Sequence, residues 1–297
     1  MLKYVMISYN YPLFRPPAEA QSIIVQVTIG CSYNSCSFCS MYKTKKYRLR
    51  CLEDIYKDID TLSNLNPKAN KVFLADGDAL SVDSDYLIEI LKYLRVKFKC
   101  LRRVSSYASA QNILNKSSDE LDSLYNHKLN LIYFGVETGN DIVLKKITKS
   151  VSQEEIIKSL NKASNSNIKI SATVILGLGG SKYSMKHIQD SAKIINETNI
   201  NYLSTLQLGL EDSIEEGFYK HFSDYKKQND FEILEEQKNF LKCLKPKNRV
   251  IFRSNHASNA LHLSGIIPRD NKKMICEIER ALNEGKSAFV PNILRGF

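Results

Sequence analysis

Several features that would define a compartment are missing from this 297-residue sequence. No apolar run approaches the roughly 20 residues that a membrane-spanning helix needs. Residues 1–17 lack the unbroken apolar stretch and the small-residue cleavage site of a secretory signal peptide. We therefore expect a cytoplasmic protein without membrane association. The sequence also has no internal repeat, no low-complexity tract and no linker that would separate a second folded domain.

The cysteines are too few and too unevenly placed for a disulfide framework. The sequence has seven, an odd number, and Cys31, Cys36 and Cys39 fall within nine residues. In a reducing compartment such bunching favours a metal site over disulfides. The other four are scattered singly and form no second cluster motif, so we interpret them as core or surface thiols: Cys51, Cys100, Cys243 and Cys276.

The three bunched thiols have the spacing C-x4-C-x2-C. Thiolates are soft ligands that suit zinc or an iron–sulfur cluster. A structural zinc site would need a fourth ligand, and the nearest further thiol, Cys51, is isolated in the sequence. Three ligands leave one iron of a cubane cluster open, and an open iron can bind a small molecule and transfer an electron to it. The spacing and the surrounding fold pattern favour the cluster over zinc.

Short apolar runs alternate with segments of helical periodicity along most of the chain. The predicted strands are 22–30, 71–75, 102–107, 129–136, 168–176 and 202–208, and the predicted helices between them are 52–62, 85–96, 117–126, 152–164 and 184–198. A Ser-x-x-Glu capping box at Ser152 and Glu155 supports the fourth helix. Six such units predict an α/β fold with a parallel sheet, as a partial (β/α)6 TIM-like barrel.

The same pattern divides the chain into three parts. Residues 22–209 form the predicted barrel core, and residues 1–21 form a segment at the barrel mouth. Residues 210–297 form a C-terminal α/β extension that we expect to pack on the core. Within this extension we predict helices over 231–244 and 272–283, and a strand over 249–253.

Residues that could bind a ligand or take part in catalysis follow the ends of the predicted strands. The cysteines come after the first strand, and later strand ends carry Asp76-Gly77-Asp78, Ser105-Ser106, Glu137 and Gly177-Leu178-Gly179-Gly180. Parallel β/α folds place their active sites at the carboxyl ends of the strands. We therefore expect these segments to form one site.

With these motifs the chain resembles radical S-adenosylmethionine (SAM) enzymes, in the subgroup that includes elongator-type, methylthiotransferase and coproporphyrinogen-dehydrogenase-like proteins. The resemblance covers residues 22–208. That family usually spaces its cysteines C-x3-C-x2-C with an aromatic residue before the last one, and Phe38 supplies the aromatic here, while the first gap is one residue longer. The resemblance implies a [4Fe–4S] cluster on Cys31, Cys36 and Cys39, with SAM bound beside it.

The resemblance also implies SAM contacts at the strand ends. Asp76, Gly77 and Asp78 match the segment that holds the amino group of SAM; the alternative is an ordinary Asp-Gly turn. Glu137 matches the polar ribose contact, and the alternative is an acid at a helix N-terminus. Phe38 belongs to the same cofactor-binding set.

The remaining cofactor contacts are less specific. Ser106, with Ser105, is a candidate for the ribose, the SAM carboxylate or the substrate, and helix capping is the alternative. Gly177 begins a segment that resembles the apolar-glycine stretch beside adenine, where backbone approaches a flat ligand closely. Leu206 either packs on adenine or belongs to the core.

Candidate substrate contacts lie on both sides of the predicted core. Tyr11 and Arg15 precede the first strand, and Tyr107 ends the third. Arg253, Asn255 and His256 form a polar group in an otherwise apolar stretch. His256 is a candidate catalytic residue that exchanges a proton, or else a structural histidine.

By resemblance, the reduced cluster cleaves SAM to a 5′-deoxyadenosyl radical that abstracts hydrogen from an organic substrate. We expect a small-molecule substrate and a reductant such as flavodoxin or ferredoxin. The net charge of +10 leaves an RNA (tRNA) substrate as an alternative, although the lysines are spread along the whole chain. A non-catalytic iron–sulfur or zinc scaffold or sensor is the third interpretation. Without a cobalamin-binding segment or a second cysteine cluster, we expect neither B12-dependent methylation nor methylthiolation.

Overall fold

The computed structural model describes residues 7–296, and these form two compact units. The first contains residues up to 34, residues 41–133 and residues 165–169. The second contains residues 35–40, residues 134–164 and the chain from residue 170 onward. The predicted core begins at residue 22 and ends at residue 209, and neither of these positions is a boundary between the two units.

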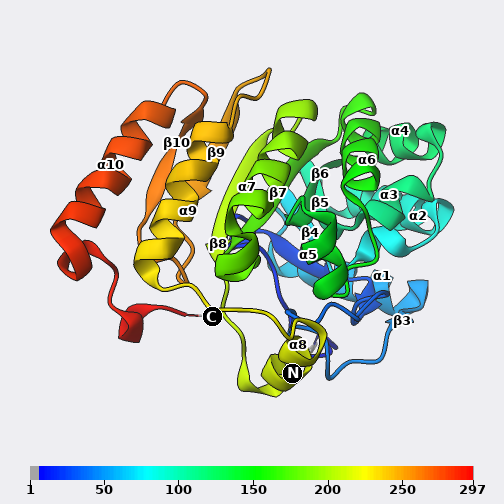
Figure 1. The fold of residues 1–297 in the computed structure, drawn as a ribbon. Coiled ribbons are helices and arrows are strands. Elements are labelled where there is room, and N and C mark those ends of the chain that lie inside the picture. Colours follow the sequence, from blue (N-terminus) through cyan, green and yellow to red (C-terminus); the bar gives the residue numbers. More distant parts are fainter. Residues whose placement is uncertain (1–6, 297) are drawn as a thin grey trace. The chain divides into compact units, whose positions relative to one another are not determined.

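The first unit is built on parallel strands. Its sheet has the order β1 (Ile23–Gln26), β4 (Lys71–Ala75), β5 (Arg103–Ala108) and the first residues of β6 (Leu129–Glu137). β1 and β5 both pair in parallel with β4. A separate antiparallel ribbon joins β2 (Thr28–Ile29) to β3 (Arg48–Leu49), and Figure 1 labels β3. The predicted strand over 22–30 is thus two short strands.

Helices cover the strands of this unit. They are α1 (Leu52–Leu65), α2 (Ser84–Lys97), α3 (Ala110–Leu114) and α4 (Ser118–Asn126), with single 3₁₀ turns at Pro17–Glu19 and Ala79–Ser81. α1 buries Ile55, Ile59 and Leu62, which lie on one helical face, and it packs against α2 and β1. α4 begins with a capping box between Ser117 and Glu120.

The second unit continues with the end of β6, β7 (Lys169–Leu176), β8 (Tyr202–Gln207), β9 (Val250–Ser254) and β10 (Leu263–Ile267). β8 pairs in parallel with both β7 and β9, whereas β10 pairs antiparallel to β9. The predicted succession of parallel strands is confirmed. It extends one strand further than the six-unit core, and β10, which was not predicted, forms an antiparallel edge.

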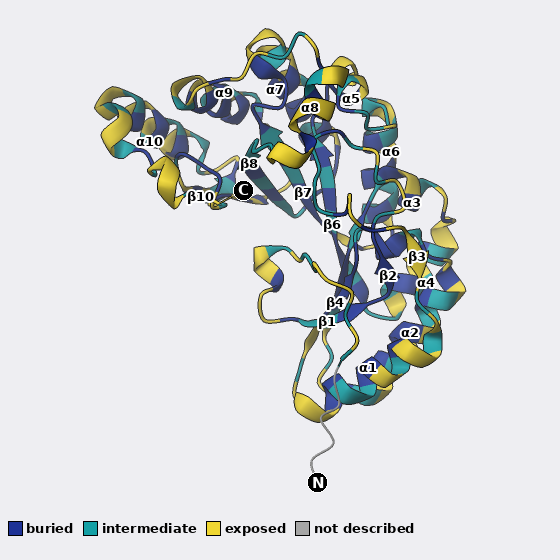
Figure 2. Ribbon diagram, turned by 90° about the horizontal axis from the view of Figure 1, so that it is seen from below, coloured by how far each residue is buried: buried dark blue, intermediate teal, exposed yellow. Residues whose placement is uncertain are grey.

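The helices of this unit are α5 (Asp141–Lys146), α6 (Gln153–Asn165), α7 (Gly180–Glu197), α8 (Asp212–His221), α9 (Asp230–Cys243) and α10 (Asn271–Glu284), followed by 3₁₀ turns at Gly285–Ala288 and Asn292–Leu294. α9 contacts both α7 and α10, and α10 contacts β10. Figure 2 shows that α10 turns a buried face to one side and an exposed face to the other. Short helices α5 and α8 were not predicted.

No helix among residues 7–296 combines the length and the apolar character that crossing a membrane requires.

Candidate functional site

In the first unit, the turn that carries Cys31 is bound to the end of β4. The Gly30 N–H donates to Oδ2 of Asp76 over 3.0 Å, and the Gly77 N–H donates to the Gly30 carbonyl over 3.2 Å. The Ser32 N–H donates to Oδ1 of Asp78 over 3.0 Å, and the Ser32 hydroxyl donates to Oδ2 of the same carboxylate. Residues 76–78 therefore hold residues 30–32 through four hydrogen bonds.

Glycine is required where these two segments meet. A Cβ atom at position 77 would lie 2.7 Å from the Cβ and 2.9 Å from the Cα of Cys31. Such distances are shorter than van der Waals contact, so any side chain here would push the cysteine away. Gly30 has φ +76°, in the left-handed region that glycine adopts without strain. Two glycines thus allow Cys31 to lie against β4.

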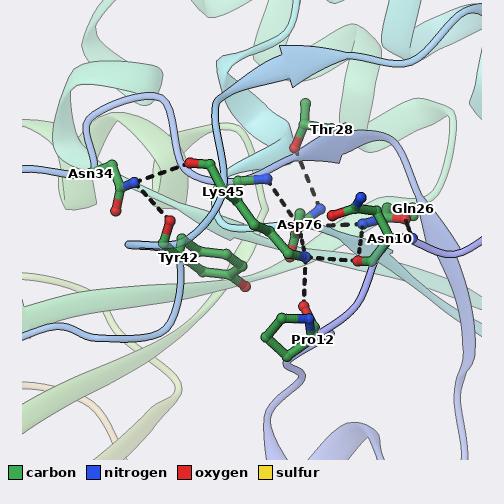
Figure 3. A network of polar contacts seen from close by, with 9 residues as sticks. Asn10, Pro12, Gln26, Thr28, Asn34, Tyr42, Lys45 and Asp76 are labelled. Carbon is green, nitrogen blue, oxygen red and sulfur yellow. Dashed lines mark hydrogen bonds and ion pairs between the residues drawn. The ribbon is translucent and has the colours of Figure 1, made fainter. Parts of the chain in front are cut away.

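Asp76 is the centre of a buried polar network, drawn in Figure 3. Its Oδ2 accepts from the Lys45 ammonium at 2.8 Å and from the Gln26 amide at 3.3 Å, in addition to the Gly30 N–H. Lys45 Nζ also donates to the carbonyls of Asn10 at 2.8 Å and Pro12 at 2.5 Å. An ammonium group has three N–H bonds, so the hydrogen-bonding capacity of Lys45 is filled.

The other oxygen of Asp76 is different. Oδ1 is buried and has no hydrogen-bond partner within residues 7–296. Buried polar atoms are normally paired, and an orphaned carboxylate oxygen is an acceptor for a ligand ammonium group. This atom fits the predicted contact with the amino group of SAM, which stays a prediction. Burial raises the pKa of Asp78, and the hydrogen bonds from Ser32 and Asn112 oppose that rise.

The longer first gap of the cysteine motif contains Asn34, whose side chain forms a brace of two hydrogen bonds across the loop. Asn34 has φ +41°, a left-handed conformation that asparagine tolerates better than most residues. Its side-chain amide donates to the carbonyl of Tyr42 at 2.8 Å and to that of Lys45 at 3.5 Å (Figure 3). Asn34, which precedes Cys36 and Cys39, is therefore hydrogen-bonded to residues 42 and 45, which follow them.

Within the second unit, residues 35–40 are fastened to α5 and its C-terminal end. The Ser37 N–H donates to the Ile147 carbonyl over 3.0 Å, and the Thr148 hydroxyl donates to the Ser35 carbonyl over 2.6 Å. Phe38 packs against an apolar cluster of buried side chains: Val143, Ile147, Leu178, Phe218 and Phe222. The aromatic residue between Cys36 and Cys39 thus anchors their loop in this unit.

Glu137 ends β6 in a strained conformation. Its φ is +63°, which a non-glycine residue rarely adopts and which is often found at functional sites. The Lys149 ammonium lies 3.3 Å from Oε1 of Glu137 and 2.6 Å from the Gly135 carbonyl. A Cβ atom at Gly135 would lie 1.9 Å from that Oε1, so the carboxylate folds back over the glycine. Lys149 was missed, because no sequence pattern marks it.

The glycine loop after β7 is closed by residues from beyond position 209. Gly177 has φ +82°, and its N–H donates to Oε1 of Glu236 over 2.7 Å. Its carbonyl accepts from the Tyr225 hydroxyl at 2.9 Å. A Cβ atom at Gly177 would lie 2.7 Å from Cδ1 of Ile233, so α9 lies directly against this loop. Burial raises the pKa of Glu236 to about 7.

His187 on α7 joins the ends of β6 and β7. Its Nδ1 lies 2.7 Å from the Thr138 hydroxyl, and its Nε2 lies 3.1 Å from the Ile175 carbonyl. A carbonyl only accepts, so the proton is on Nε2 and Thr138 donates to Nδ1. Burial lowers the pKa of His187 to about 4. The imidazole is neutral near pH 7, and its 3.9 Å approach to Glu236 is not an ion pair.

Two predicted cofactor contacts take ordinary positions on strands. Ser106 is buried on β5, and its hydroxyl donates to the Tyr107 carbonyl over 2.9 Å. Leu206 is half-buried on β8 and pairs in register with Ile175. Their contacts with SAM stay predictions.

The predicted substrate residues of the first unit differ in their surroundings. Tyr11 is 72% exposed, and the exposed Arg15 donates to the Ser22 carbonyl over 3.0 Å. The Tyr107 ring lies edge-on to the ring of Phe73, with 5.1 Å between their centroids. Only Tyr107 is part of the packed interior of the sheet.

The three substrate candidates of the second unit also differ in their exposure to solvent. Arg253 is exposed on β9, and Asn255 is exposed just beyond the strand. His256 accepts the Ser258 N–H on Nδ1 over 3.2 Å, which places its proton on Nε2. Burial lowers the pKa of His256, so the ring is a neutral donor near pH 7.

A hollow of about 710 Å³ opens in the first unit beside β2 and β3. Its lining residues are Asn10, Tyr11, Ile29, Thr44, Lys45, Lys46, Tyr47 and Arg48. Lys45 is neutralised by Asp76, whereas Lys46 and Arg48 are exposed. The basic residues after the cysteines therefore present fewer available charges than their number in the sequence indicates.

The three cysteines are half-buried, and the described residues contain no disulfide. Within residues 7–296, no three His, Cys, Asp or Glu side chains are gathered as ligands of a metal ion. The donor set itself consists of three thiols from one loop, and thiolates are the ligands that iron–sulfur clusters use.

Comparison with known proteins identifies a family. The model described as the radical SAM superfamily matches residues 25–195. The heme chaperone HemW of Buchnera aphidicola is 23% identical over 232 residues, which cover 74% of this chain and 59% of HemW. The chain spans less than two thirds of the length of the curated relatives that it matches.

Two solved structures share the fold. Coproporphyrinogen III oxidase HemN from Escherichia coli superposes with a TM-score of 0.54 and 18% identity, over 74% of this chain and 52% of HemN. Elp3 of Methanocaldococcus infernus superposes with a TM-score of 0.51 and 14% identity, over 87% of this chain and 63% of Elp3. The expected fold class, a mostly parallel α/β sheet of the partial TIM-barrel kind, is confirmed, and the relatives that the chain resembles include proteins of the expected subgroup.

Proposed function

The chain belongs to the radical SAM superfamily, whose members use a [4Fe–4S] cluster and SAM, and we propose that Cys31, Cys36 and Cys39 ligate that cluster. When bound, these groups would supply a 5′-deoxyadenosyl radical for the abstraction of hydrogen from an organic substrate. The observation that carries the proposal is the attachment of the Cys31 turn to residues 76–78. It brings the first cysteine to the end of β4, where Oδ1 of Asp76 has no hydrogen-bond partner within residues 7–296 and can accept from the amino group of SAM.

The chain's own residues have positioning roles in this proposal. Asp78 holds the Cys31 turn through Ser32, and Asp76 both holds the turn and offers Oδ1 to the SAM amino group. Lys149 fixes the carboxylate of Glu137 for the ribose hydroxyls. Glu236 fixes the backbone of Gly177 for adenine.

Substrate contacts in the proposal are assigned by accessibility and polarity. Tyr107 contributes an aromatic wall in the first unit, and Tyr11 and Arg15 contribute exposed groups. In the second unit, Asn255 is exposed and His256 offers an Nε2–H donor. Because His256 is neutral near pH 7, it orients a substrate oxygen rather than pairing with an anion.

The reaction also needs a reductant. Radical SAM enzymes require an electron for the cluster, and a flavodoxin or ferredoxin is the proposed donor. The proposed substrate is a small molecule.

The direct test is anaerobic reconstitution of the full chain. We expect about four irons per chain, as for one cubane cluster, and release of 5′-deoxyadenosine from SAM when dithionite is added. Replacing Cys31, Cys36 and Cys39 by alanine should abolish both, whereas Cys276→Ala, at an exposed position outside the motif, should abolish neither. A fully loaded and reduced protein that leaves SAM intact would falsify the proposal.

A second candidate function is modification of RNA, and the hollow beside β2 and β3 favours it. Exposed Tyr11 and Tyr47 rings there accompany the cations Lys46 and Arg48, and such a combination stacks bases and contacts phosphates. Binding of a bulk tRNA preparation should then weaken steeply as salt is added. The double variant Lys46→Gln/Arg48→Gln should reduce both the affinity and the salt slope. Binding that ignores salt, or no binding, would exclude this candidate.

A further inference from the structure

In the second unit, one face of strands β8 to β10 is covered by helices (Figure 1). Gln237 of α9 donates to the hydroxyl of Ser254 on β9 over 2.7 Å and to that of Thr205 on β8 over 3.4 Å. On β10, a Cβ atom at Gly265 would lie 3.0 Å from Sδ of Met274 on α10. Side chains alternate between the two faces of a strand, so residues one step away point to the opposite face.

A polar row crosses four strands on that opposite face. Thr173 on β7 pairs with Ser204 on β8, Ser204 pairs with Arg253 on β9, and Arg253 pairs with Ser264 on β10. Directly paired residues project from the same face of a sheet. We name these four residues the Arg253 row. It places Arg253 between serine residues of both neighbouring strands.

The Arg253 row is flanked by less polar rows. On one side lie Tyr202, Ile251 and Ile266, which are in register with one another. On the other side, toward the carboxyl ends of β7 and β8, lie Ile175 and Leu206. A single cation surrounded by hydroxyls and then by apolar side chains suits a ligand that has one anionic group on an apolar body.

The polar groups of the row make little use of their hydrogen-bonding capacity within the described residues. Arg253 donates to its neighbour's carbonyl, Phe252 O, over 2.8 Å, and no carboxylate among residues 7–296 pairs with it. By contrast, Arg295 in the same unit forms two bonds of 2.8 and 2.9 Å to Asp230. Arg253 therefore retains donors for a ligand, and it is exposed.

We propose that the Arg253 row binds a carboxylate group of the substrate. A guanidinium presents two parallel N–H bonds that match a carboxylate, and the hydroxyls of Ser204 and Ser264 add donors on either side. One positive charge balances one carboxylate. This inference rests on the proposed function, because it assigns the substrate of that reaction to the class of apolar monocarboxylic acids.

The test uses benzoate as the probe, on the full chain loaded with its cluster under anaerobic conditions, with ligand-observed NMR as the readout. Benzoate should bind and its neutral isostere benzamide should not. Arg253→Gln should weaken benzoate binding at least ~10-fold, because it removes the charged partner of the carboxylate. Arg253→Lys should restore part of that loss, since it keeps the charge without the planar fork. Ser264→Ala should weaken binding by a smaller factor.

Arg249→Gln is the matched control, because Arg249 is exposed just before β9 and the substitution removes the same charge. It should leave benzoate binding unchanged. Equal binding of benzoate and benzamide, or equal losses in Arg249→Gln and Arg253→Gln, would overturn the assignment. Displacement of benzoate by SAM would also overturn it, because the row would then hold the carboxylate of SAM. Release of 5′-deoxyadenosine by the wild-type chain, measured separately, tests the proposed function whatever the benzoate result.

Discussion

Lys45 and Asp76 form a buried ion pair, with 2.8 Å between Nζ and Oδ2 and side chains that are 3% and 0% exposed. They are 31 positions apart in the sequence. The pair connects the segment after the cysteines to the end of β4, and the carbonyls of Asn10 and Pro12 extend the connection to the start of the chain (Figure 3).

Removing one partner of this pair should be costly. Lys45→Met leaves the Asp76 carboxylate buried without its counter-ion, and breaking such a pair typically costs about 3–5 kcal/mol. We expect a loss of that size in the free energy of unfolding, measured by urea titration of the metal-free chain. Lys46→Met, at the exposed neighbouring position, should change it by no more than about 0.5 kcal/mol.

A double variant separates charge from packing. Lys45→Met/Asp76→Asn removes the uncompensated charge, so it should be more stable than Lys45→Met alone. The single variant Asp76→Asn completes the comparison. If the stability losses of Lys45→Met and Asp76→Asn simply add in the double variant, the ion pair is not what stabilises this network.

Gly77→Ala should displace Cys31. The new methyl group would lie 2.7 Å from the Cβ of Cys31 and 2.9 Å from Cε2 of Tyr42, and neither neighbour is the end of a flexible side chain. We expect a large fall in iron content after reconstitution, measured per folded chain. Gly217→Ala in α8 is the control, since its Cβ meets nothing within 4 Å, and it should bind iron normally. Full iron loading of Gly77→Ala would contradict the close packing described for this turn.

Lys149→Met should weaken SAM binding without unfolding the protein. The side chain is partly exposed, and its role here is to hold Oε1 of Glu137 over Gly135. A freed carboxylate loses its fixed orientation toward the ribose, so we expect roughly tenfold weaker binding of SAM, equivalent to about 1.4 kcal/mol. Equilibrium dialysis of SAM with the cluster-loaded chain measures this. Lys145→Met, on the exposed side of α5, should bind SAM as the wild type does; an equal loss there would point to charge alone.

Glu236 should make stability depend on pH. Burial raises its pKa from the ordinary 4.5 to about 7, so the folded protein holds this proton more tightly than the unfolded chain does. Its contribution to stability is fully present below about pH 4.5 and is lost as the pH rises through about 7, to an extent on the order of 3 kcal/mol at most. Urea unfolding between pH 5 and 8 should show that the stability of the wild type, relative to that of Glu236→Gln at the same pH, declines as the pH rises.

His187 acts in the opposite direction over an overlapping pH range, so the effect of Glu236 is measured as the difference between the wild type and Glu236→Gln. Burial lowers its pKa from 6.5 to about 4, so its contribution is present above pH 6.5 and is lost as the pH falls through about 4.

The control for Glu236→Gln is Glu235→Gln, one residue earlier on the exposed face of α9, which should retain the wild-type profile. A flattened profile in that control would assign the pH dependence to surface charge.

The regular elements were predictable because their signals are local. The apolar run 71–75 is β4 with the same bounds, and the capping box of Ser152 and Glu155 is present, with their reciprocal bonds at 2.8 and 3.2 Å. β10 was not predictable in this way. It has five residues with a central glycine, and it is a strand because it pairs with β9, which is a non-local contact.

The partners of the site residues were harder to predict than its location. The strand-end positions of Cys31, Asp76 and Glu137 were expected and are found. A run of basic residues, however, does not reveal which one is buried, so Lys45 could not be distinguished from Lys46. Nor does the Glu- and Lys-rich pattern of α9 indicate that Glu236 reaches a glycine loop 59 residues earlier. Such contacts depend on the packing of distant elements.

The brace at Asn34 has a consequence for how long a preparation stays usable. Asn34 is followed by Ser35, and asparagine before a small residue deamidates on standing. The reaction replaces the amide donor by a carboxylate that would face the carbonyls of Tyr42 and Lys45, at the 2.8 and 3.5 Å distances now spanned by hydrogen bonds. Repulsion would open the loop that contains Cys36 and Cys39. Aged protein should therefore gain one unit of negative charge and lose iron in parallel, without any change in its cysteines.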